Sequence, residues 1–208
     1  MTLDEALAEC GVIAIIRGVR PEEALAVADA LYAAGVRVVE VPLNSPNPFE
    51  SIRLLARDYH GRLFCGGGTI LSVADVERVA AAGGRLMVSP NTDANVIRQA
   101  VVLGMVPFPG FATATEAFAA IEAGARHLKL FPASTYGSGH LKALKAVLPT
   151  DVIVAPVGGV GAAEMAQWRA AGAGCFGIGS EMYKPGMAPE EVHRQAVELV
   201  KAEKASRS

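Results

Sequence analysis

Short apolar runs rich in β-branched residues alternate with alanine-rich amphipathic stretches along the whole chain. The apolar runs have the length of strands and recur about every 20–25 residues, with room for one helix in each gap. They predict eight strands, at Val12–Arg17, Val38–Pro42, Leu63–Gly67, Leu86–Ser89, Val106–Pro109, His127–Phe131, Val152–Val157 and Cys175–Ile178.

Two of the intervening segments carry clear helix boundary signals. The segment Pro21–Ala34 begins with proline, which suits the first helical turn, and is followed by Gly35, which suits the C-cap. The segment Thr113–Ala123 begins with threonine, and Glu116 three residues later completes a capping box before Gly124 ends the helix. Both gaps therefore hold helices.

Strands that alternate with helices form parallel sheets through right-handed crossovers. Eight such units favour a (β/α)₈ TIM barrel, α/β in class, over the alternative of an open doubly wound sheet. The open sheet would normally place a dinucleotide-binding glycine fingerprint after the first strand, but the sequence there is Arg17-Gly18-Val19-Arg20. We expect a single domain over 1–208, a last helix over 188–205 and a polar tail over about 203–208.

Composition excludes several classes of function. The chain of 208 residues is 51% apolar and 19% charged, and its net charge of −2 provides no basic surface for nucleic acid or anionic lipid. No apolar run reaches the roughly 20 residues that span a bilayer. The N-terminus is acidic where a signal peptide would be basic. The three cysteines are widely spaced and odd in number, which indicates free thiols in a reducing cytoplasm. The four histidines lack metal-ligand spacing, so we expect no metal.

Alternation along three predicted strands places charged side chains inside the barrel. If Val39 and Val41 pack against the helices, Glu40 points inward, and the same pattern in His127–Phe131 points Lys129 inward. Arg17 lies at the C-terminal end of the first strand, in register with the side chains of that strand that point inward. Active sites of such barrels lie at the C-terminal ends of the strands. Three charges are therefore predicted to meet at one barrel mouth.

A buried lysine in this position suits covalent chemistry with a ketone. Its neutral amine forms an iminium, which withdraws electrons from the adjacent carbon–carbon bond. A lysine with a pKa near 10.4 is neutral in only about one molecule in 2,500 at pH 7, so burial and a neighbouring cation must lower the pKa. Glu40 would then transfer protons. The alternative is a buried ion network, although such networks seldom add stability.

Three glycine-rich turns supply candidate anion sites. Val157–Gly161 follows the seventh predicted strand and Gly177–Ser180 ends the eighth, where barrels of this class commonly bind phosphate. A third turn, Gly66–Thr69, follows the third strand and places backbone amides and the Thr69 hydroxyl where they could bind a carboxylate. The alternative interpretation of the two later turns is tight-turn geometry alone, but their combined position after the seventh and eighth strands favours phosphate binding.

Five segments together resemble the KDPG/KHG aldolase family, in order and at consistent spacing from about Val12 to Gly186. They are Ile13–Gly18, Val39–Pro46, Gly66–Ile70, Leu128–Ala133 and Pro156–Val160. The resemblance implies a class I aldolase that cleaves a phosphorylated 2-keto-3-deoxy sugar acid to pyruvate and D-glyceraldehyde 3-phosphate. It also implies that the enzyme needs no cofactor and forms a homotrimer.

The resemblance also implies individual roles. Lys129 would form the Schiff base and Glu40 would donate and accept protons, while Arg17 and Thr69 would bind the carboxylate end. The phosphate would be held by residues of the two later turns, Gly158, Gly159 and Ser180. One departure from the family pattern is Gly67, where alanine is usual.

Two differences within the family favour the galactonate configuration at C4 of the substrate. The gluconate-specific branch has threonine before the glycine pair and a Glu-Val-Thr-Leu-Arg-Thr stretch, whereas this chain has Val157 and Glu40-Val41-Pro42-Leu43-Asn44-Ser45. Without the threonine hydroxyl, one C4 epimer loses a partner, so Val157 is a candidate substrate-binding residue. The alternatives are the gluconate epimer and 4-hydroxy-2-oxoglutarate.

Two other classes of function remain open from the residues alone. A phosphate-binding isomerase would share the barrel and its glycine turns but would not need a lysine on the sixth strand. A phosphosugar-binding module without activity would leave the convergence of Arg17, Glu40 and Lys129 unexplained.

Overall fold

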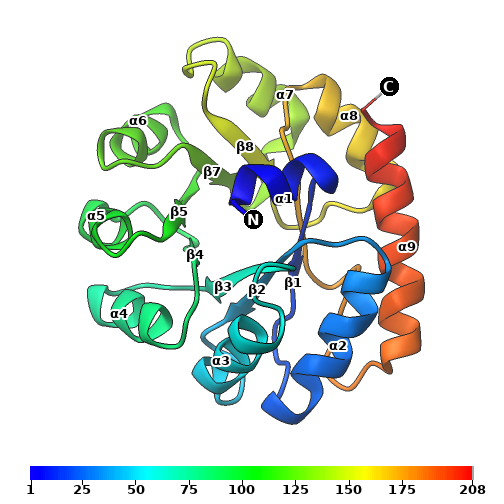
Figure 1. Cartoon of the computed structure of the whole chain (residues 1–208). Coiled ribbons are helices and arrows are strands. Elements are labelled where there is room, and N and C mark those ends of the chain that lie inside the picture. Colours follow the sequence, from blue (N-terminus) through cyan, green and yellow to red (C-terminus); the bar gives the residue numbers. More distant parts are fainter. Residues whose placement is uncertain (208) are drawn as a thin grey trace.

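The computed structural model describes residues 1–207 as strands surrounded by helices (Figure 1). The helices are α1 Leu3–Glu9, α2 Pro21–Ala33, α3 Pro48–Asp58, α4 Val73–Ala81, α5 Ala94–Val102, α6 Ala114–Glu122, α7 Ala133–Lys145, η1 Ala162–Glu164, α8 Met165–Ala170 and α9 Pro189–Ala205. The strands are β1 Val12–Ile15, β2 Val38–Pro42, β3 Phe64–Gly68, β4 Leu86–Val88, β5 Val106–Phe108, β6 Gly110–Phe111, β7 His127–Leu130, β8 Ile153–Pro156 and β9 Phe176–Ile178.

The strands form two parallel sheets. The larger sheet has six strands in the order β5-β4-β3-β2-β1-β9, and the smaller has three in the order β6-β7-β8. An isolated parallel bridge joins Val157, just after β8, to Gly177 in β9. The predicted parallel α/β fold, with a helix after nearly every strand, is therefore confirmed.

All eight predicted strands are present, with ends that differ by at most two residues. The fifth predicted strand corresponds to β5, and the short strand β6, which was not predicted, follows after Pro109 and pairs with β7 instead of β4. The predicted capping box at Thr113 and Glu116 starts α6. Helix α1 was not predicted, although Thr2 and Glu5 form a capping box there too.

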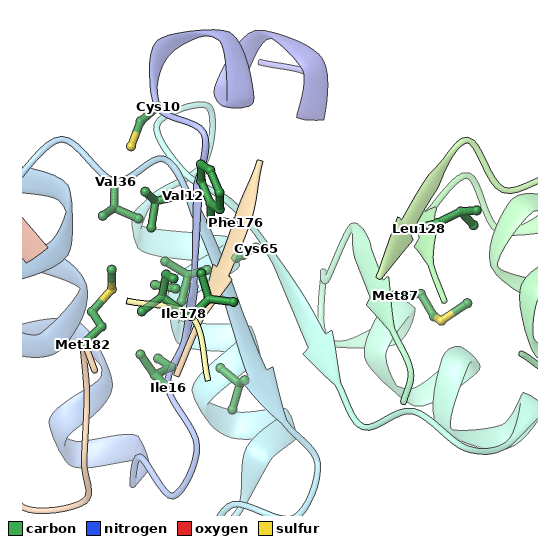
Figure 2. Close-up of a cluster of buried hydrophobic side chains, with 14 of the residues drawn as sticks. Cys10, Val12, Ile16, Val36, Cys65, Met87, Leu128, Phe176, Ile178 and Met182 are labelled. Atoms are coloured by element: carbon green, nitrogen blue, oxygen red, sulfur yellow. The ribbon is translucent and has the colours of Figure 1, made fainter. Parts of the chain in front are cut away.

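Apolar side chains fill two regions, one on each side of the strands. The outer cluster joins the strands to the surrounding helices, and Figure 2 shows part of it, where Val12 of β1 lies beside Phe176 of paired β9. The inner cluster contains Ile13 and Ile15 of β1 together with Phe108 of β5. Successive side chains along a strand therefore point alternately toward the helices and toward the interior.

Helix α1 covers the N-terminal end of the strands (Figure 1). Its Leu3 and Leu7 belong to the inner cluster, and Asp4 Oδ1 lies 2.9 Å from Nε2 of the buried His127. His127 is thus a hydrogen-bonded core histidine. With this end covered, the interior opens at the C-terminal ends of the strands.

The predicted polar tail over 203–208 is wrong at its start. Helix α9 continues to Ala205, and Glu203 is fully buried. Its Oε1 atom accepts hydrogen bonds from Arg169 and Arg207, both at 2.7 Å, and Arg207 also donates to the carbonyls of Leu7 and Ala8. The sequence suggested a solvated end because one of the two arginine partners of this carboxylate, Arg169, lies 34 residues earlier in the chain. Ser208 lies outside the described residues.

Within residues 1–207, no helix is both long and apolar enough to cross a membrane. The three cysteines are buried and unbonded, and burial raises the pKa of the Cys65 thiol to about 11 and of Cys175 to about 12. These thiols are therefore protonated and unreactive at neutral pH.

Candidate active site

A cavity of about 390 Å³ lies at the C-terminal ends of the strands. We call it the mouth cavity. Every predicted site residue except Glu40 lines it, namely Arg17, Thr69, Lys129, Val157, Gly158, Gly159 and Ser180. The residues come from β7 and from the segments after β1, β3, β8 and β9, so the fold brings distant parts of the chain to one place.

Lys129 and Glu40 occupy the interior positions that strand alternation predicts. Their neighbours Val39, Val41, Leu128 and Leu130 are in the outer cluster against the helices. Lys129 and Glu40 line one smaller cavity together and are 6% and 2% exposed. A lysine and a glutamate are thus buried around the same interior cavity.

The burial of this pair changes the proton affinity of both groups. Burial lowers the pKa of Lys129, the Glu40 carboxylate opposes this and the Arg17 guanidinium adds to it. Burial raises the pKa of Glu40, whereas Lys129 and Arg17 lower it. Both shifts favour the neutral forms, an amine that can attack and a carboxylic acid that can donate. The Nζ atom of Lys129 also lies 5.0 Å from the centre of the Phe131 ring.

Gly68 provides the space for the Glu40 side chain. A Cβ atom at Gly68 would lie 1.4 Å from Oε2 of Glu40, so no larger residue fits while the carboxylate keeps its position. The next glycine, Gly67, faces the other side of β3, where a Cβ atom would meet Val79 of α4 at 2.8 Å. The two glycines therefore serve different purposes, one for the site and one for helix packing.

Arg17 is held at the cavity by two neighbouring segments. Its Nη1 atom donates to Oδ1 of Asn44, and Nη1 and Nη2 each lie 3.5 Å from Oγ1 of Thr69. Thr69 has a φ of 56°, a left-handed conformation that is rare for a β-branched residue and marks local strain. A guanidinium and a hydroxyl next to each other form a suitable site for a carboxylate.

The two later glycine turns lie on the same cavity. Gly158 and Gly159 have φ values of 93° and 73°, so the chain requires glycine there. Ser180 adds a hydroxyl whose oxygen lies 3.4 Å from Oε1 of Glu181. The turn can thus present backbone N–H groups and a hydroxyl to an anion, as the sequence predicts.

Sequence reasoning missed several residues that line the cavity or hold its side chains, among them Phe131, Asn44 and Lys184. Phe131 follows Lys129 by two positions and shares its inward direction, so alternation could have identified it. Asn44 differs from the arginine of the gluconate branch, and that difference was a usable signal. Lys184 lines the cavity from a loop that has no periodic pattern.

The site has the groups for amine catalysis on a ketone. Lys129 has an amine that can act as a nucleophile, Glu40 has a carboxyl group that can donate and accept protons, and the two ends of the cavity each suit an anion. Among residues 1–207, no group of three or more histidine, cysteine, aspartate or glutamate side chains is placed to hold a metal ion.

Comparisons with known proteins agree on one family. The family model described as KDPG and KHG aldolase matches residues 3–198. The 2-dehydro-3-deoxy-6-phosphogalactonate aldolase of Escherichia coli (strain K12) is 48% identical over 190 residues, which cover 91% of this chain and 93% of that protein.

Solved structures extend the similarity to the fold. A structure described as native KDPGal is 46% identical, has a TM-score of 0.93 and covers 94% of this chain and 95% of its own. The KDPG aldolase of Legionella pneumophila, crystallised with pyruvate captured at low pH as a covalent carbinolamine, is 26% identical with a TM-score of 0.86, covering 96% of this chain and 98% of its own.

Proposed function

Because this chain belongs to the KDPG/KHG aldolase family, we propose that it is a class I aldolase that cleaves 2-dehydro-3-deoxy-6-phospho-D-galactonate to pyruvate and D-glyceraldehyde 3-phosphate. The observation that carries the proposal is the buried Lys129, which lines the mouth cavity and shares a smaller interior cavity with the buried Glu40. An isomerase or a binding module with the same fold has no use for a nearly dry lysine at this position.

The neutral amine of Lys129 attacks the C2 ketone and forms a carbinolamine, which loses water to give an iminium. The electrons of the C3–C4 bond then move into the iminium, and the C4 hydroxyl loses its proton as D-glyceraldehyde 3-phosphate leaves. The resulting enamine takes up a proton at C3, and hydrolysis releases pyruvate and regenerates the amine. Glu40 accepts and returns the protons of these steps. No redox change and no cofactor is involved.

The positions of the other residues support an orientation for the substrate. Arg17 and Thr69 bind the carboxylate next to the C2 ketone, and the N–H groups around Gly158 and Gly159, with Ser180, bind the phosphate. The positive charge of Arg17 also favours the neutral form of Lys129. The same guanidinium therefore binds the substrate and activates the nucleophile.

The preference for the galactonate epimer depends on the same cavity. Val157 lines the cavity without a hydrogen-bonding group, and its Cγ2 atom lies 2.6 Å from the position of a Cβ at Gly177. A wall of this kind gives the C4 hydroxyl of the gluconate epimer no partner. Discrimination by an apolar wall amounts to about 1–3 kcal/mol, so other contacts contribute to the preference.

The proposal includes a closed architecture. The described residues, 1–207, form one (β/α)₈ barrel in which β5 and β6 are a single strand interrupted at Pro109. The single residue between β5 and β6 and the parallel bridge from Val157 to Gly177 support this closure. The same proposal includes a cytoplasmic homotrimer. Light scattering tests the trimer, because the measured particle mass should be three times that of one chain.

The test is an assay in which lactate dehydrogenase and NADH detect pyruvate. The purified enzyme, dialysed against a chelator, is given each C4 epimer of the phosphorylated substrate separately. We expect a higher kcat/KM for the galactonate epimer, with no need for added metal. No pyruvate from either epimer contradicts the aldolase function, and a higher value for the gluconate epimer contradicts only the choice of substrate.

A further inference from the structure

The loop between β9 and α9 forms one wall of the mouth cavity. Ser180, Glu181, Tyr183, Lys184 and Pro185 all line the cavity from this loop. Of these residues, only Ser180 was predicted from the sequence to contact the phosphate. Lys184 places a cation on the same wall, four residues further along the chain.

The backbone around Lys184 is anchored on both sides. The N–H groups of Met182 and Tyr183 donate to the carbonyl of Gly179, at 2.9 and 3.0 Å, which closes one tight turn after Ser180. The side chains of Met182 and Tyr183 are buried in the outer cluster. Pro185 packs so closely on Gly18 that a Cβ atom there would lie 2.6 Å from Cγ of the proline. Lys184 therefore extends from a fixed base.

The Lys184 ammonium has no protein partner among residues 1–207. No ion pair or hydrogen bond of its side chain occurs in that part of the chain, although most of the arginines are paired with carboxylates. Glu181 is the nearest carboxylate in sequence, but its Oε1 atom accepts a hydrogen bond from the Ser180 hydroxyl at 3.4 Å instead. Lys184 thus retains its donors for a ligand in the cavity.

The distribution of charge in the cavity leaves one task for this cation. The proposed substrate carries a carboxylate and a phosphate dianion. Arg17 is committed to the carboxylate end, where Asn44 and Thr69 hold it, and Lys129 has to be neutral to react. The turn at Gly158 and Gly159 supplies only neutral donors, and a hydrogen bond to a charged donor is roughly twice as strong as one to a neutral donor.

We propose, on the basis of the aldolase function above, that Lys184 is the cation of the phosphate end and sets the preference for phosphorylated over unphosphorylated keto-deoxy sugar acids. It acts as a point charge beside the neutral donors of the glycine turn and Ser180. Because lysine contributes only through the phosphate, its effect should lie in KM for the phosphorylated substrate rather than in kcat.

The experiment compares wild type, Lys184→Met, Lys184→Arg and the control Lys142→Met, which removes an exposed lysine of α7 outside the cavity. Each protein is assayed with the phosphorylated galactonate substrate and with its unphosphorylated analogue. Trapping with pyruvate and borohydride, which involves no phosphate, reports whether the lysine site is intact. We expect Lys184→Met to raise KM for the phosphorylated substrate about tenfold, since Lys184 is exposed and partly screened.

The result that supports the proposal is a loss confined to the phosphorylated substrate, largely restored by Lys184→Arg and absent in Lys142→Met. An equal loss on both substrates, or no loss, overturns the role of Lys184. A wild-type enzyme that neither cleaves the substrate nor traps pyruvate instead contradicts the proposed function, so the two failures are distinguishable.

Discussion

Gly68→Ala tests whether the position of the Glu40 carboxylate determines the rate. The added methyl would lie 1.4 Å from Oε2 and 2.6 Å from Cδ of Glu40. Non-bonded atoms need about 3.5 Å, so the carboxylate has to move by about 2 Å. The φ angle of Gly68 lies outside the left-handed region, so its backbone accepts alanine and the side-chain clash is the main perturbation.

The expected loss is large in activity and moderate in stability. Displacing a proton-transfer group by about 2 Å should lower kcat by about 10²–10⁴-fold. Overpacking of a buried site should lower the free energy of unfolding by about 1–3 kcal/mol, which a chain of this size can tolerate. The variant should therefore be folded and nearly inactive.

Gly67→Ala is the matched control. Its methyl would meet Cγ2 of Val79 at 2.8 Å and Cδ1 of Ile70 at 3.1 Å, on the helix side of β3 and away from Glu40. It should cost stability of a similar size and leave kcat within about twofold, because the proton-transfer group does not move. Both variants are measured by the pyruvate-coupled assay and by urea denaturation.

A double-mutant cycle identifies the cause of the loss. In a Glu40→Ala background there is no carboxylate to displace, so adding Gly68→Ala should lower the residual rate little further. A folded Gly68→Ala variant with wild-type kcat would refute the reasoning, and so would full additivity of the two losses.

Three further outcomes follow from the same geometry. Glu40→Gln should lower kcat by about 10²–10⁴-fold, and near wild-type turnover would assign proton transfer elsewhere. The rate of pyruvate trapping should rise with pH as Lys129 loses its proton. Because the Glu40 carboxylate raises the pKa of Lys129, Glu40→Gln should move the midpoint of this rise to lower pH. A midpoint moved to higher pH would contradict this coupling. Val157→Thr should raise the gluconate-to-galactonate ratio of kcat/KM by about tenfold, and an unchanged ratio would remove Val157 from the explanation of specificity.

Much of the fold and of the site could be predicted because the information is local. Strand alternation is a two-residue period, so the apolar neighbours of Glu40 and Lys129 were sufficient to place both side chains inside the strands. The capping box at Thr113 and Glu116 likewise lies within four residues.

What could not be predicted depends on contacts between distant segments. The burial of Glu203 depends on Arg169, 34 residues earlier, and the position of Arg17 depends on Asn44, 27 residues later. The short strand β6 after Pro109 depends on pairing with β7, whereas β5 pairs with β4. None of these contacts leaves a periodic trace in the sequence.

The measurement that tests the central claim most directly is mass spectrometry of the protein after incubation with pyruvate and borohydride. The account predicts one reduced pyruvyl adduct per chain, on the peptide that contains Lys129, and no adduct in Lys129→Met. An adduct on another residue, such as Lys142 or Lys145, or an adduct that persists in Lys129→Met, would contradict the assignment of Lys129 as the Schiff-base residue.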